Sequence, residues 1–350
     1  MKKSPALRFF IGLLVAVLLF APLSWILGDP VASYRIPGGY RSISARDSFG
    51  SVERHHAFSD FSAFILPWKD TVNQVVTPAL SLDFVCRQNR TNTASIVDGL
   101  NFVAEASLQE QVFFPIYTEA ERAADPSLEE TGLILIRGEP GMPVAVLTSG
   151  GGFSSVCLFM ESFPVGRVLH RMGYTVAMPK YRVDPAFHFQ TDDPAERERT
   201  ANADFSRALA FLFENQQSLR IDMTDYSVWG FSAGGRTTWL WGLDEECGYA
   251  AHGLPAPAAM VLVYSGWYDE ARAGHYGAMP PCYFAWLPED DVIGAENASG
   301  IGRMIDELRT LGIPCEESRY HQAKHGFGEG RGTDAEGWIK IAVSFWETQR

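Results

Sequence analysis

A serine set between two glycines is the feature of this chain that is best suited to chemistry. Gly230-Phe231-Ser232-Ala233-Gly234 follows the apolar run from Tyr226 to Trp229 and precedes a segment, Gly235 to Leu243, that is typical of a helix. A sharp turn from strand to helix would present the Ser232 hydroxyl to a substrate, and glycines leave room for the neighbouring strand and helix. The pentapeptide alone also fits an ordinary glycine-rich turn, so other residues have to decide.

A histidine near the C-terminus could activate this serine. A serine hydroxyl is a poor nucleophile at neutral pH and needs a base within hydrogen-bonding reach. His325 lies in the glycine-containing loop Ala323 to Gly328, just beyond the predicted strand Glu316 to Tyr320, and glycines let that loop bend back towards the serine. His321 is the nearest alternative, but its position at the end of the strand favours a structural hydrogen bond. We therefore take His325 as the candidate base.

The third member of such a group is a carboxylate that orients the histidine. It should follow the strand before the histidine, and the predicted strand Cys282 to Leu287 runs into Pro288-Glu289-Asp290-Asp291. We choose Asp291 and keep Asp290 as the alternative acid, whereas Glu289 is typical of a solvated loop. Asp269 is a more remote alternative.

A run of glycines could stabilise the negative charge that develops during attack on a carbonyl. Thr148-Ser149-Gly150-Gly151-Gly152-Phe153 follows the predicted strand Val144 to Thr148. Backbone N–H groups can approach an oxyanion closely where no side chain intervenes. Gly151 or Gly152 would donate together with Ala233, the residue after the serine. The three glycines could otherwise form only a loop.

Elements of an α/β fold surround these residues. From about Thr131, short apolar runs alternate with longer amphipathic segments, which predicts a mostly parallel central sheet with helices on both faces. The predicted strands are 111–118, 133–137, 144–148, 174–178, 226–229, 259–264, 282–287 and 316–320. The predicted helices include one that has Asp193 as its N-cap and Pro194 in its first turn, one over 299–311 and one over 333–348.

The N-terminus and the composition bound the organisation of the chain. Lys2, Lys3 and Arg8 precede the apolar stretch from Phe9 to Leu27, which predicts a signal peptide or a membrane anchor within residues 1–30. The protein would be exported to the periplasm or the outside, or anchored to the membrane through residues 9–27. Residues 31–110 are expected to form an N-terminal extension packed on a catalytic domain of residues 111–350.

Charge and cysteine content exclude other classes of protein. A formal charge of -13 without a Lys/Arg cluster argues against a nucleic-acid partner. Five scattered cysteines lack C-x-x-C spacing, and they are more typical of buried small residues than of a disulfide framework. No metal or organic cofactor is expected, because side chains and backbone fill every role and the sequence has no H-E-x-x-H or paired-cysteine site.

These segments resemble the α/β-hydrolase superfamily, and within it bacterial carboxylesterases of the acetylesterase and acetyl xylan esterase type and feruloyl esterase-like domains of gut bacteria. The resemblance covers about residues 110–350 and rests on the glycine loop, the serine turn, Glu289-Asp290-Asp291 and His325-Gly326-Phe327-Gly328. Lys180-Tyr181-Arg182-Val183 and Ala335-Glu336-Gly337-Trp338 look like structural matches. One departure is Ser149, where many relatives carry a histidine that organises the loop.

The resemblance implies a serine carboxylesterase that acts on short acyl groups, above all acetyl, on a small molecule or a carbohydrate. Ser232 would attack, His325 would take its proton and Asp291 would support the histidine. A serine peptidase of the same fold is one alternative, although no large gating domain is evident upstream. A non-catalytic binding protein of the cell envelope that has kept the scaffold is another.

Overall fold

The computed structural model describes residues 23–29, 34–36, 39–65, 77–183, 194–243, 245–265, 275–277 and 279–350. Residues 1–22, which hold most of the predicted signal or anchor, lie outside these ranges, and so do Asp193 and Asp269. No helix within the described ranges is both long and apolar enough to cross a membrane.

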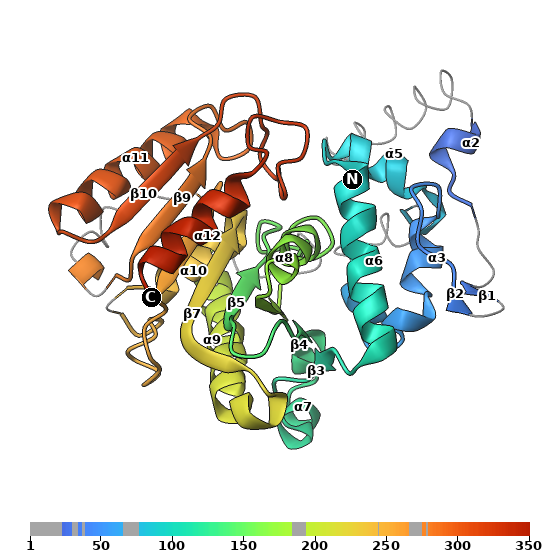
Figure 1. Ribbon diagram of the computed structural model, residues 1–350, viewed down its shortest axis with the longest axis horizontal. Helices are drawn as coiled ribbons and strands as arrows, with labels where there is room; N and C mark the ends of the chain where they lie inside the picture. The colour runs from blue at the N-terminus through green and yellow to red at the C-terminus, as the bar shows by residue number, and fades with distance from the viewer. Residues whose placement is uncertain are drawn as a thin grey trace, which may run out of the picture.

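A mostly parallel sheet of eight strands forms the centre of the molecule, as predicted (Figure 1). Its spatial order is β10-β9-β8-β7-β5-β6-β4-β3, and the antiparallel pairs are β3 with β4 and β4 with β6. The strands are β3 (Phe113–Phe114), β4 (Gly132–Ile136), β5 (Pro143–Thr148), β6 (Thr175–Lys180), β7 (Asp222–Phe231), β8 (Ala259–Val263), β9 (Cys282–Trp286) and β10 (Cys315–Arg319). This is the α/β-hydrolase fold.

Helices cover both faces of the sheet because its central strands are apolar on both sides. Along β5, Val144 and Val146 face one hydrophobic core, whereas Ala145 and Leu147 face the other. The first core is closed by α9 (Pro194–Leu219), α10 (Ser232–Trp241) and α11 (Gly294–Thr310), and the second by α8 (Ser162–Arg171) and α12 (Trp338–Thr348).

The N-terminal residues pack on the side of the sheet that α8 and α12 cover (Figure 1). They form α2 (Leu23–Ile26), α3 (Phe49–Glu53), α5 (Leu82–Gln88) and α6 (Thr93–Gln109), the 3₁₀ turns η1 (His56–Phe58), η2 (Ser62–Phe64) and η3 (Thr77–Ala79), and the hairpin β1 (Arg35–Ile36) and β2 (Gly39–Tyr40). Between β3 and β4 lie α7 (Glu119–Ala124) and the 3₁₀ turn η4 (Pro126–Glu130). Asn92 caps α6, and Ile96, Leu100 and Val103 on one face of α6 join the shared core. At Gly99 a Cβ atom would lie only 2.8 Å from the Pro164 nitrogen, so α6 and α8 touch directly.

Several helix boundaries differ from the predicted ones: α10 begins at Ser232 rather than at Gly235, and two other helices differ more. The last helix begins at Trp338 rather than at Thr333, because turns occupy the preceding residues and Gly337 adopts φ of 92°. α11 begins at Gly294, earlier than the predicted start at Ser299. All five cysteines lie within the described ranges, and none of them forms a disulfide bond there.

Candidate active site

Ser232 stands on a tight turn between β7 and α10. Its φ is +50°, a conformation that costs energy for a residue with a side chain. The neighbouring glycines allow the turn because added Cβ atoms would lie 2.5 Å from Thr238 Oγ1 at Gly230 and 2.1 Å from the Thr148 carbonyl oxygen at Gly234. The turn therefore has the geometry that its sequence predicts, with the Ser232 side chain partly exposed.

A chain of hydrogen bonds joins Ser232, His325 and Asp290. His325 Nε2 lies 2.8 Å from Ser232 Oγ, and His325 Nδ1 lies 2.8 Å and 3.0 Å from the two carboxylate oxygens of Asp290. The side chains of His325 and Asp290 are 10% and 1% exposed. A base in contact with a hydroxyl, and oriented by a buried acid, is the arrangement that activates a serine.

The acid in this chain is Asp290, which corrects the choice of Asp291. Asp290 Oδ1 also accepts hydrogen bonds from the backbone N–H groups of Val292 (2.9 Å) and Ile293 (3.0 Å), and this local turn directs its side chain inwards. Asp291 does not reach the His325 ring: it forms an ion pair of 2.6 Å with Arg90 and accepts a long hydrogen bond of 3.4 Å from the backbone N–H of His325. Glu289 is exposed, as predicted.

The environment of Asp290 keeps its carboxyl group ionised. Burial alone would raise its pKa, but the hydrogen bond and the charge of His325, together with the two backbone N–H groups, hold the pKa below its ordinary value. A carboxylate in this state can stabilise a positive charge on His325. It also favours the tautomer whose Nδ1 carries the proton.

The loop that carries His325 is held from its C-terminal side. Asp334 accepts hydrogen bonds from three consecutive backbone N–H groups, at His321, Gln322 and Ala323. The Trp338 indole N–H donates to the carbonyl oxygen of Gly328 at 2.9 Å. Of the two candidate histidines, only His325 contacts Ser232, whereas His321 is exposed. Asp334 was not singled out by the sequence.

The glycine loop lies against the serine turn. A Cβ atom on Gly150 would come within 2.6 Å of Ser232 Cβ and 3.3 Å of the Ala233 nitrogen. Gly151 and Gly152 line the same cavity as Ser232 and His325. The structure thus brings together all three predicted oxyanion residues, while the Tyr181 hydroxyl steadies the loop by donating to the Ser149 carbonyl oxygen at 2.8 Å.

A buried acidic residue that sequence reasoning missed lies behind this loop. Glu161 Oε2 accepts a hydrogen bond of 2.6 Å from the Gly150 N–H, and Oε1 accepts one of 3.0 Å from the Tyr264 hydroxyl. Burial raises the pKa of Glu161 to about 7, although both hydrogen bonds and the charge of His325 act in the opposite direction. A carboxyl group in the apolar stretch before α8 was the available signal.

The serine and the histidine open into a cavity of about 470 Å³. Besides the glycine loop, its wall contains side chains from the turn after α5, from the segment before α8 and from the residues around the start of α11. These are Asn89, Thr91, Met160, Val292, Ile293 and Asn297. The wall therefore combines amide and hydroxyl groups with apolar side chains, and part of it comes from the N-terminal extension.

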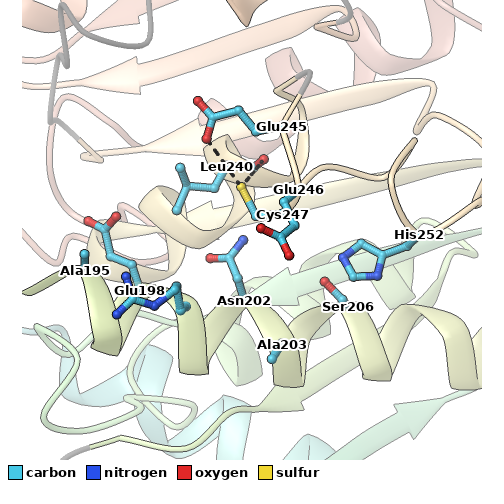
Figure 2. Close-up of a pocket in the computed structure, with 11 residues that line it drawn as sticks. Ala195, Glu198, Asn202, Ala203, Ser206, Leu240, Glu245, Glu246, Cys247 and His252 are labelled. Atoms are coloured by element: carbon cyan, nitrogen blue, oxygen red, sulfur yellow. Dashed lines mark hydrogen bonds between the residues drawn. The ribbon is translucent and has the colours of Figure 1, made fainter.

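A second cavity, of about 400 Å³, lies between α9 and the segment that follows α10 (Figure 2). Asn202 and Ser206 project into this region from one face of α9, opposite Cys247 and His252. Among the described residues, the linings of the two cavities have no member in common, so this cavity is separate from the serine site. The described part of the chain brings no three His, Cys, Asp or Glu side chains into an arrangement that could hold a metal ion.

A family model and several solved structures match this chain. The model of the BD-FAE family matches residues 136–251, a segment that includes the glycine loop and the serine turn but ends before Asp290 and His325. A sequence comparison with curated proteins finds no match.

Three solved structures illustrate the likeness in fold. An acetyl ester-xyloside bifunctional hydrolase from Caldicellulosiruptor lactoaceticus is 19% identical, with a TM-score of 0.53 over 67% of this chain and 95% of that one. A sugar hydrolase from Lactococcus lactis is 17% identical, with a TM-score of 0.50 over 63% and 94%. Esterase 2 from Thermogutta terrifontis is 17% identical, with a TM-score of 0.50 over 62% and 89%. At these identities the likeness shows the fold alone.

Proposed function

We propose that this α/β-hydrolase-fold protein is a serine carboxylesterase that works through an acyl-enzyme. The hydrogen-bonded chain from Ser232 through His325 to Asp290, at the wall of an open cavity, is the observation that carries the proposal. The solved structures of similar fold include an esterase and an acetyl ester hydrolase, which supports the same reaction class.

In the proposed mechanism, His325 Nε2 takes the proton of Ser232 while Oγ attacks the ester carbonyl carbon. Asp290 stabilises the imidazolium that forms. The oxyanion is bound by the N–H of Ala233 and that of Gly151 or Gly152, next to the positive end of α10. His325 then donates its proton to the leaving alcohol, and a water molecule activated by the same histidine hydrolyses the acyl-enzyme.

The substrate that we propose is a short acyl ester, above all an acetyl ester, of a polar alcohol such as a carbohydrate. Asn89, Thr91 and Asn297 line the cavity, and although each side chain donates one hydrogen bond to a nearby backbone carbonyl, their oxygen atoms can accept from an alcohol with several hydroxyl groups. Met160 and Val292 supply apolar surface for a small acyl group. The hydrolase from Caldicellulosiruptor lactoaceticus, whose name includes an acetyl ester and a xyloside, is consistent with this assignment.

We also propose that the protein works outside the cytoplasm. It would be released if its N-terminal segment is cleaved as a signal peptide, and attached to the membrane if that segment stays as an anchor. The basic residues Lys2, Lys3 and Arg8 ahead of the apolar stretch support this location. N-terminal sequencing of the protein recovered from separated cell fractions tests it. A chain that retains Met1 and stays in the cytoplasmic fraction would contradict export.

The activity is tested with p-nitrophenyl acetate, a longer-chain ester and acetylated xylan. Ser232→Ala and His325→Ala should each lower kcat on acetate by at least about 10³-fold. His321→Ala is the matched control, because His321 precedes the same loop and is exposed, and it should keep kcat. Peptide amides test the peptidase alternative. Wild-type protein that cleaves no ester would refute the proposal and favour a peptidase or a binding protein.

A further inference from the structure

The carboxyl group of Glu161 has a position that packing alone does not explain. Its side chain belongs to a residue that is only 5% exposed, and it contributes to the cavity that holds Ser232 and His325. Placing a carboxyl group in such surroundings costs free energy unless hydrogen bonds compensate, and an apolar residue would avoid the cost. Glu161 is therefore a candidate for a role in the reaction.

The two hydrogen bonds of Glu161 lead to two different neighbours of the reacting groups, one beside Ser232 and one beside His325. On one side, Oε2 holds the N–H of Gly150, the residue that packs on Ser232 and begins the glycine loop. On the other side, Oε1 holds the hydroxyl of Tyr264, whose ring centroid lies 5.0 Å from that of His325. Because its own N–H is engaged by Glu161, Gly150 leaves the oxyanion to the residues that follow it.

We propose that Glu161 is a positioning residue for ester hydrolysis. Its carboxylate holds the glycine loop at the distance from Ser232 that oxyanion binding needs, and through Tyr264 it supports one face of the His325 ring. The inference rests on the proposed function, because it assigns Glu161 to the same site. Glu161 itself does not touch the reacting atoms, so its effect is transmitted through Gly150 and Tyr264.

The ionised form of Glu161 is the form that anchors the loop. A hydrogen bond of 2.6 Å from an N–H group is typical of a charged acceptor. Four groups from the surrounding elements face the carboxylate: His325 after β10, Tyr264 after β8, Tyr181 after β6, and Cys157 in the same loop. Burial raises the pKa of both tyrosines and of Cys157, so these three groups keep their protons at neutral pH.

Substitution of Glu161 in the full chain tests this role. Glu161→Ala should lower kcat on p-nitrophenyl acetate by about 10²-fold and change KM less than about threefold, because displacement of the oxyanion donors that follow Gly150 acts on the transition state. Glu161→Gln keeps an acceptor for Gly150 and should recover kcat to within about tenfold of wild type. Glu347→Gln is the matched control: Glu347 accepts a hydrogen bond from Tyr174 at 2.8 Å, away from Ser232, and its loss should leave kcat unchanged.

Two further readouts separate positioning from a purely structural role. The acid limb of the kcat/KM profile should lose one ionisation in Glu161→Gln, because the residue that titrates has been removed. Amide hydrogen exchange at Gly150 should accelerate in Glu161→Ala and be largely restored in Glu161→Gln.

The outcomes keep this inference distinct from the proposed function. Wild-type kcat and unchanged exchange at Gly150 in Glu161→Ala, with Ser232→Ala inactive, would overturn the positioning role and leave the esterase standing. Wild-type protein without any esterase activity would overturn the function, and the exchange rates would still show whether Glu161 anchors the glycine loop. Identical pH profiles in wild type and Glu161→Gln would refute the role of the ionised form.

Discussion

Replacing the two neighbouring aspartates separately gives the sharpest test of the site. Asp290→Asn should almost abolish hydrolysis, whereas Asp291→Asn should leave most of it. Both changes remove one negative charge and add one amide, so they differ only in what the original side chain contacts. Asp290 contacts the Nδ1 atom of the His325 ring, whereas Asp291 contacts Arg90 at the surface and accepts only a long hydrogen bond of 3.4 Å from the backbone N–H of His325.

The size of the effect follows from those contacts. His325 Nδ1 donates to both oxygens of Asp290, at 2.8 Å and 3.0 Å, in a side chain that is 1% exposed. Because Nδ1 carries one proton, the two distances describe one bifurcated hydrogen bond to a charged acceptor, which contributes about 1.5–3 kcal/mol. An asparagine amide also favours the wrong histidine tautomer, so kcat should fall by about 10⁴-fold.

Substitution of Asp291 should have a much smaller effect on kcat. Its side chain is 32% exposed and that of Arg90 is 67% exposed, and an ion pair of this kind contributes about 0.2–1 kcal/mol. Asp291→Asn should therefore change kcat by less than about fivefold.

The assay is steady-state hydrolysis of p-nitrophenyl acetate at saturating substrate, with urea denaturation of each variant as the control for folding. A variant that unfolds at the same urea concentration as wild type has lost activity for a local reason. A larger loss of kcat in Asp291→Asn than in Asp290→Asn would refute the assignment of the acid.

Three further predictions concern the supports of the site. Gly150→Ala should lower both kcat and the free energy of unfolding, because its Cβ would lie 2.6 Å from that of Ser232, and enzyme assays beside urea titrations measure the two effects; wild-type values for both would contradict the close approach. Asp204→Asn should lower the free energy of unfolding by about 3 kcal/mol, because Asp204 is buried against the Arg182 guanidinium, and a shift within the error of the urea titration would argue against that ion pair. Glu161→Gln should make the free energy of unfolding less dependent on pH. In the folded wild type the pKa of Glu161 is about 7, above the ordinary 4.5, so its free energy of unfolding falls by up to about 3 kcal/mol as pH rises from below 4.5 to above 7. Parallel curves of this free energy for the two proteins at pH 4–8 would exclude the effect.

Local sequence patterns predicted the fold because the central strands are short, continuous apolar runs. The strands from β4 to β10 were each located to within a few residues. The serine turn could be predicted because it needs glycines at the positions where the backbone approaches its neighbours too closely for a Cβ atom. α6 was missed, although the Asn92 cap and the spacing of Ile96, Leu100 and Val103 are helical. Its surroundings are rich in turn-forming residues, and these obscured the period.

Features that depend on the direction of a side chain, or on contacts between distant parts of the chain, could not be predicted from local sequence patterns. Asp290 and Asp291 are adjacent and chemically identical, and only the turn that Asp290 makes with Val292 and Ile293 directs it to His325. Glu161 meets Tyr264 from more than a hundred positions away along the chain. Such pairings arise from tertiary structure, so the sequence around each residue does not indicate its partner.

The turn after α5 contributes to the cavity although it lies far from Ser232 and His325 in the sequence. Asn89 and Thr91 line the cavity from outside residues 136–251, the stretch that the family model matches. The segments that carry Ser232 and His325 must keep their geometry for the reaction to proceed. The turn carries no residue of the proposed reaction, so under the proposed function we expect its exchange to change which alcohols bind while Ser232 and His325 keep their geometry.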